Sequence, residues 1–69
     1  MRNVVIDADT LRLGDSNSTI IMNATSNHRG GWRWYSSLAM RSGKGWTFKS
    51  AEAALRAGAK QLDLNIIED

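Results

Sequence analysis

Residues 50–62 read SAEAALRAGAKQL, and this stretch decides the fold because it predicts a helix. Ser50 is a favoured N-cap, since its hydroxyl oxygen accepts a hydrogen bond from the first turn of a helix. Glu52 suits the positive end of the helix dipole. Small and apolar residues recur at helical spacing: Ala51, Ala54, Leu55, Gly58 and Leu62. This stripe predicts a helix that packs closely on one face of a sheet.

The segments before the helix have the composition and the period-two pattern of β-strands. The clearest is 32–40, which puts one set of side chains on one face: Trp32, Trp34, Ser36, Leu38 and Met40. The other face receives Arg33, Tyr35, Ser37, Ala39 and, just beyond the strand, Arg41. Further strands are expected at 3–8, 19–24 and 46–48, with turns at 14–18 and 42–45. Two questions stay open: residues 10–13 continue the first strand or form a second one, and residues 64–67 form a final strand or an apolar tail.

These elements predict an α+β fold in which an antiparallel β-sheet of three to five strands is packed on one face by a single C-terminal α-helix. A chain of 69 residues is enough for one small domain, so residues 1–69 are expected to fold together. Trp34 and Phe48 are expected in the core beneath the helix, because few other large apolar residues are available to fill it. The opposite face of the sheet is left for solvent or a partner.

The composition argues against an enzyme. The chain has one histidine and no cysteine, which excludes Cys/His catalysis and metal sites built from thiolates or several histidines. We interpret His28 as a surface residue, Asp7 and Asp9 as solvated carboxylates, and residues 43–45 as a turn rather than a phosphate loop. No cofactor, metal ion or small-molecule substrate is therefore expected.

Nothing in the sequence predicts a membrane protein or a secreted one. No apolar run approaches the ~20 residues that a membrane-spanning helix needs. The segment 1–7 reaches an acidic residue too early for the core of a signal peptide. Together with the absence of cysteine, this favours a cytoplasmic location.

Charge is segregated along the chain, although the formal net charge is only +2. No acidic residue lies between Ser16 and Ala51, and the same window holds every aromatic residue of the chain. Arginine binds phosphates and carboxylates through its planar fork, and aromatic rings stack on bases or fill protein pockets. The predicted contact residues are Arg29, Trp32, Arg33, Tyr35, Arg41, Lys44 and Lys49.

Residues 47–57, TFKSAEAALRA, are similar to the strand-to-helix junction of the APETALA/ethylene-response-factor type of DNA-binding domain, whose relatives include the arm-binding domains of phage integrases. Residues 28–30 also resemble the Tyr-Arg-Gly element of that family. The resemblance covers the C-terminal half and implies a three-stranded antiparallel sheet on one helix, with the sheet in the major groove of DNA. It would assign DNA contacts to four residues: Arg29, Trp32, Arg33 and Arg41.

The leading hypothesis is a non-catalytic DNA-binding module that uses a basic, aromatic-rich face of the sheet. The alternative is an inhibitor or adaptor, encoded by a phage or mobile element, that binds and blocks a host protein, because Trp, Tyr and Arg are the usual residues of protein hot spots. A homodimer that covers the tryptophans is a third possibility. DNA binding requires the basic residues to share one surface and the acids to lie elsewhere.

Overall fold

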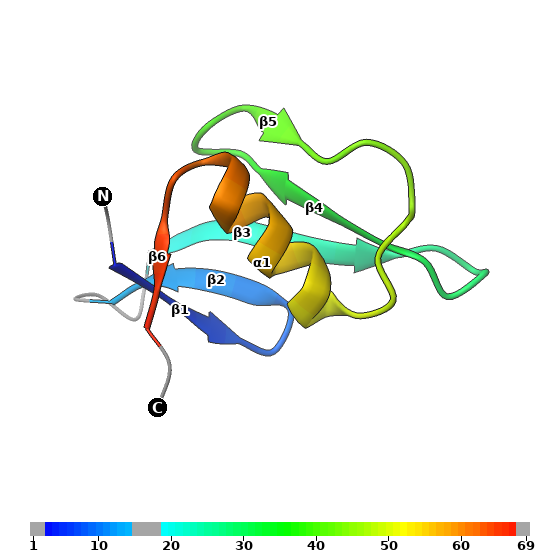
Figure 1. The fold of residues 1–69 in the computed structure, drawn as a ribbon, viewed down its shortest axis with the longest axis horizontal. Helices are drawn as coiled ribbons and strands as arrows, with labels where there is room; N and C mark the ends of the chain where they lie inside the picture. Colours follow the sequence, from blue (N-terminus) through cyan, green and yellow to red (C-terminus); the bar gives the residue numbers. More distant parts are fainter. Residues whose placement is uncertain (1–2, 15–18, 68–69) are drawn as a thin grey trace.

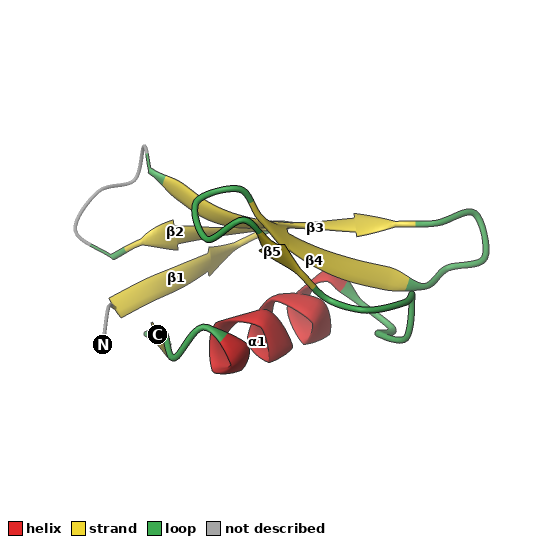
Figure 2. Ribbon diagram, turned by 90° about the horizontal axis from the view of Figure 1, so that it is seen from above, coloured by secondary structure: helices red, strands yellow, loops and turns green. Residues whose placement is uncertain are grey.

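The computed structural model describes residues 3–14 and 19–67. The fold is α+β, with one helix on one face of a six-stranded sheet (Figures 1 and 2). The strands are β1 (Asn3–Asp7), β2 (Thr10–Leu13), β3 (Ile20–Ser26), β4 (Trp32–Ser36), β5 (Arg41–Ser42) and β6 (Asn65–Ile66). Their order across the sheet is β5-β4-β3-β2-β1-β6.

The sheet is mixed, which corrects the expectation of a purely antiparallel sheet of three to five strands. Strands β1 to β5 form an antiparallel meander, whereas β6 pairs in parallel with β1. The chain leaves the sheet at β5, crosses one face through the helix and adds β6 at the far edge (Figure 1). The Ile67 backbone nitrogen donates to the Val4 carbonyl at 2.8 Å. A strand of two residues is too short to show alternation, so the sequence could not decide between a final strand and an apolar tail at 64–67.

The helix α1 (Ala51–Gln61) confirms the prediction for this segment. The Ser50 hydroxyl accepts a hydrogen bond from the Ala53 backbone nitrogen at 3.1 Å, as an N-cap does. Its buried residues are Ala54, Leu55, Gly58 and Ala59. A Cβ added at Gly58 would lie 2.5 Å from the Met22 sulfur and 2.7 Å from the Trp34 ring, so the missing side chain lets the helix approach the sheet.

The first hairpin settles one open question, because residues 10–13 form a second strand. β2 pairs antiparallel with β1, and the turn between them holds Ala8 at φ 57°. The first strand therefore ends at Asp7 and not at Ala8. β3 runs two residues further than expected, to Ser26. The turn expected at 14–18 falls mostly on residues 15–18, which lie outside the described part of the chain.

The strand expected at 32–40 is shorter, because β4 ends at Ser36. The buried Ser36 hydroxyl donates to the Ile21 carbonyl at 2.8 Å and accepts from the Ala39 backbone nitrogen at 3.2 Å. This side chain thereby closes a turn over 37–40, as serine does in turns. Alternation holds only as far as Ser36, and Leu38 and Met40 are exposed in the turn instead of sharing the face of Trp34.

Residues 42–45 do not form the expected hairpin turn. The β4–β5 hairpin turns at 37–40, and 43–49 form the loop that leads from β5 to the helix. Phe48 makes a single bridge with Trp32, where the expected strand 46–48 would have paired. Trp34 is buried as predicted, and Phe48 is partly buried and packs against the core.

Candidate nucleic-acid interface

Arg33 and Tyr35 lie on the face of the sheet that the helix leaves open, as predicted. They alternate along β4 with Trp34 and Ser36, which are buried on the helix-covered face. Across the sheet Arg33 pairs with Thr25, and Tyr35 pairs with Asn23 on one side and Ser42 on the other. The Tyr35 side chain is therefore surrounded by polar neighbours, and the residue is 47% exposed.

Trp46 is the aromatic partner of Arg33. The Arg33 guanidinium carbon lies 5.5 Å from the centroid of the Trp46 ring, within the range of a cation–π contact. Trp46 is 42% exposed. Its backbone packs against Gly31, where an added Cβ would lie 2.4 Å from the Trp46 carbonyl oxygen. The 43–49 loop is thereby held against the start of β4.

The strand pattern predicts Trp32, and not Trp46, as an aromatic contact beside Tyr35. The structure places Trp32 on the helix-covered face, half-buried against the core, on the opposite side of β4 from Arg33. The signal that could have found Trp46 is its setting between Gly45 and Thr47, after Gly43, because glycine-rich segments form surface loops. Gly45 indeed has a positive φ of 70°.

Arg41 does not share the open face with Arg33, which corrects the prediction for that residue. The turn at 37–40 interrupts the strand, so the alternation of β4 does not continue into β5. Arg41 pairs with buried Ser36, which places it on the helix-covered side, whereas Ser42 pairs with Tyr35. Arg41 and Lys44 instead line a hollow of about 520 Å³ beside the helix. Its other walls are Trp34, Ser42, Gly43, Phe48, Ala57 and Gln61.

Arg29 and Lys49 line a second hollow, of about 470 Å³, beside the turn that connects β3 to β4. Its other walls are Asn27, Gly30, Gly31, Trp46, Thr47 and Phe48. The Asn27 side-chain oxygen accepts hydrogen bonds from the backbone nitrogens of Arg29 and Gly31, at 3.0 and 2.8 Å, which orders this hairpin end. Phe48 lines both hollows, so the two basic hollows are neighbours along the 43–49 loop.

We call this region the basic edge. It consists of the five cations and two exposed aromatic residues around β4, β5 and the 43–49 loop: Arg29, Arg33, Tyr35, Arg41, Lys44, Trp46 and Lys49. The predicted contact residues thus lie around one edge of the sheet, on both of its sides, and not on one flat face. Trp32 is excluded from this set because it is half-buried beneath the edge.

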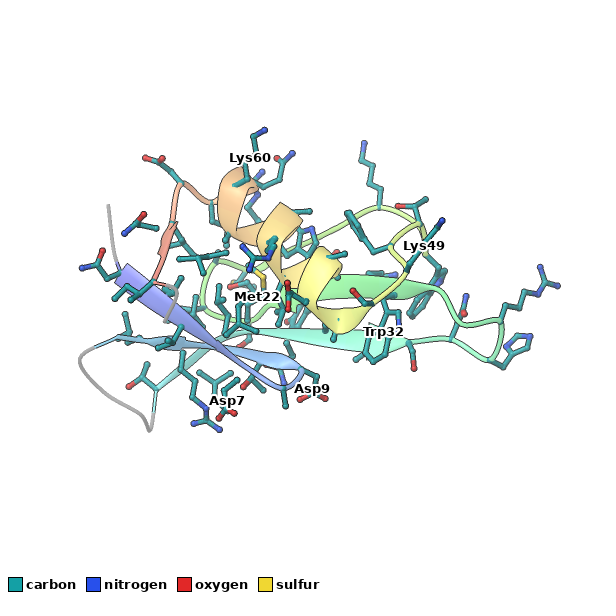
Figure 3. All side chains as sticks on the ribbon, turned by 60° about the horizontal axis from the view of Figure 1, so that its bottom comes forward. Asp7, Asp9, Met22, Trp32, Lys49 and Lys60 are labelled. Atoms are coloured by element: carbon teal, nitrogen blue, oxygen red, sulfur yellow. The ribbon has the colours of Figure 1, made fainter. Side chains whose placement is uncertain are left out.

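Two of the acids among the described residues are paired with cations outside the basic edge. Asp7 forms an ion pair with Arg12 at 3.2 Å on the β1–β2 hairpin, and Glu52 pairs with Arg56 at 3.0 Å on the outer side of the helix. Figure 3 shows Asp7 and Asp9 at the β1–β2 hairpin, away from Lys49. Within residues 3–14 and 19–67, no cation of the basic edge forms an ion pair with a carboxylate.

A separate exposed feature is the apolar turn between β4 and β5. Leu38 is 61% exposed and Met40 is 84% exposed. Beside the turn lies a hollow of about 270 Å³, lined by Ile21, Ser36, Leu38, Ala39, Leu62 and Leu64. Exposed apolar side chains on a turn are typical of protein contacts.

Neither a metal site nor a membrane span is found among the residues that the structure describes. No group of three or more His, Cys, Asp or Glu side chains comes together there to hold a metal ion. No helix there has the length and apolar character needed to cross a bilayer. Comparison of the chain with protein families, curated proteins and solved structures finds no match. Function is therefore inferred from the residues of the site alone.

Proposed function

We propose that the protein binds nucleic acid, with DNA as the first candidate, through the basic edge. One observation carries the proposal. Five cations from residues 29–49 gather around the 43–49 loop and strands β4 and β5, and within the described residues none of them is paired with a carboxylate. Cations that the protein does not neutralise internally are available to an external polyanion.

The chemistry of the edge suits phosphates and bases together. Arg29, Arg33 and Arg41 offer planar forks that donate two hydrogen bonds to one phosphate, and Lys44 and Lys49 add point charges. Tyr35 and Trp46 present exposed rings on which bases stack. The contact of Arg33 with Trp46 restricts the arginine, so less of its conformational freedom is lost on binding.

The edge, and not the open face as a whole, is the proposed contact surface. On the open face, Arg33 and Tyr35 lie at the β4 end, whereas Asp7 lies at the β1 end in its pair with Arg12. A polyanion laid flat across the whole face would meet the Asp7 carboxylate. Contact along β4, β5 and the 43–49 loop avoids it.

The test is fluorescence anisotropy of a labelled mixed-sequence DNA, offered both as a duplex and as a single strand at low salt. We expect micromolar or tighter binding of at least one form. Lys44→Ala with Lys49→Ala should weaken it about tenfold or more, since each lost phosphate contact removes one released counterion. The matched control is Arg56→Ala with Lys60→Ala, which removes the same charge from the outer side of the helix and should leave affinity nearly unchanged.

Equal losses in the two double variants would mean that binding follows net charge and not the basic edge. Absence of binding to either DNA form would overturn the proposal. The alternative function, binding of a host protein as an inhibitor or adaptor, would then be the one to pursue. For it the exposed turn with Leu38 and Met40 is the first surface to mutate.

A further inference from the structure

We infer that the basic edge is built for a single, unpaired nucleic-acid strand and not for a duplex. The inference rests on the proposed function and names the form of ligand for that same site. It follows from the way the cations are distributed about the edge of the sheet, on both of its sides.

The cations face in opposite directions across β4 and β5. Arg33 lies on the open face, in the same β4 alternation as Tyr35. Arg41 pairs in register with buried Ser36 and, with Lys44, lines the hollow against the helix. The 43–49 loop connects the two sides, because Trp46 contacts Arg33 while Phe48 at its end reaches the core.

A duplex fits this distribution poorly. Double-stranded DNA has a persistence length of roughly 150 base pairs, so it is straight over the 35 Å length of this molecule. A straight rod laid on the open face reaches Arg33 and Tyr35 but not the hollow on the other side. A rod laid against the helix side reaches Arg41 and Lys44 but not Arg33. In either position part of the positive charge is unused. A duplex that takes the edge into its major groove reaches both sides, but its bases stay stacked on one another and leave the exposed Trp46 ring without a partner.

A single strand bends freely and can follow the edge. The two hollows supply a path, since they share Phe48 as a wall and carry cations at both ends, Arg29 and Lys49 in one and Arg41 and Lys44 in the other. Trp46 lines the hollow that holds Arg29 and Lys49 and is 42% exposed, so an unpaired base can stack on it while phosphates contact the cations. In a duplex, bases are already stacked on their neighbours and offer no free ring face.

The experiment compares one labelled 15-nucleotide DNA, of mixed sequence, alone and annealed to its complement, in the same buffer. We expect the single strand to bind at least tenfold more tightly. Trp46→Ala should weaken single-strand binding by about 5- to 150-fold, the range for loss of one base–aromatic stack. Trp46→Phe keeps a ring and should retain most of the affinity. Tryptophan fluorescence should be quenched by the single strand in the wild type, and much less in Trp46→Phe.

The outcomes separate this inference from the proposed function. Equal or tighter binding of the duplex would overturn the single-strand inference and leave nucleic-acid binding standing. Failure of both forms to bind would overturn both. Full single-strand affinity in a folded Trp46→Ala variant would overturn the stacking role. If Trp46→Ala fails to fold, the test uses Trp46→Phe instead. Fluorescence quenching as strong as in the wild type would then overturn the stacking role of Trp46.

Discussion

The two faces of the sheet differ in the interactions that their side chains make. On the helix-covered face, Trp34 is buried against Met22 and the helix, and the only buried polar residue described, Ser36, has both hydrogen-bond roles filled. On the open face, charged side chains are held by ion-pair and ring contacts and not by burial under the helix. There Asp7 pairs with Arg12 at one end, and Arg33 lies over Trp46 at the other.

Because of this difference, residues that are neighbours in the sequence contribute to different properties, stability on the covered face and binding on the open face. Trp34 lies between Arg33 and Tyr35, yet its side chain points to the core and theirs point outward. A substitution on the covered face should therefore change the free energy of unfolding. A substitution on the open face or the basic edge should change ligand binding and leave stability almost intact. Four variants test this division, from the largest expected effect on stability to the smallest.

Trp34→Ala should lower the free energy of unfolding by about 3–5 kcal/mol, because it leaves a cavity between the sheet and the helix. Urea denaturation followed by circular dichroism measures the loss. The matched control is the adjacent Tyr35→Ala, expected to change stability by about 0.5 kcal/mol or less. Similar losses of unfolding free energy for the two variants would show that the open face contributes to stability as much as the covered face does.

Gly58→Ala should be destabilising by about 1–3 kcal/mol, although alanine is the better helix former by about 1 kcal/mol. The added Cβ would lie 2.5 Å from the Met22 sulfur and 2.7 Å from the Trp34 ring. Thermal unfolding measures the effect. A rise in melting temperature would mean that helix propensity outweighs the crowding and that close packing on the covered face is not required.

Ser50→Ala should cost about 1 kcal/mol, since it removes the side-chain cap on the Ala53 backbone nitrogen. Ser50→Asp restores an acceptor and should recover most of the loss. The comparison is made by urea denaturation. No difference between the alanine and aspartate variants would show that the cap contributes nothing to holding the helix over the covered face.

Of these four variants, Arg33→Ala should have the smallest effect on stability, about 0.5–1 kcal/mol, which is the range of an exposed cation–π contact. Urea denaturation measures the change. Arg33→Lys keeps the charge and should be nearly neutral for stability, while losing the planar fork that holds a phosphate. A loss as large as that of Trp34→Ala would place Arg33 among the structural residues and remove it from the basic edge.

The sequence predicted the parts of the fold that leave a periodic or chemical signal. The N-cap at Ser50, the small-residue stripe with Gly58, and the burial of Trp34 all follow from local rules, and the structure confirms them. The sequence left residues 64–67 open between a final strand and an apolar tail, and it did not predict that β6 pairs in parallel with β1. The pairing of β6 with β1 involves only two residues of each strand. It depends on where the chain lies after the end of the helix, and that position is set by the whole fold and not by local sequence.

For the candidate site, the sequence indicated a set of residues but not their arrangement in space. The acid-free window contains the cations that the structure places around one edge of the sheet. Extending the period-two rule past Ser36 placed Arg41 on the wrong side, because the serine turn resets the alternation. The sequence favours Trp32 over Trp46 as a contact residue because alternation along a strand predicts which side of the sheet a residue faces. A tryptophan in a loop belongs to no such pattern, so its direction cannot be predicted.

The most direct test of the account is the salt dependence of single-strand DNA affinity for the wild type and for Arg33→Ala with Arg41→Ala. These two arginines lie on opposite sides of the sheet edge. Five phosphate contacts predict a log–log slope of about −3.5, and the double variant should reduce its magnitude by about 1.4. An unchanged slope would mean that the cations of the basic edge do not contact the phosphates, which would contradict the proposed binding surface.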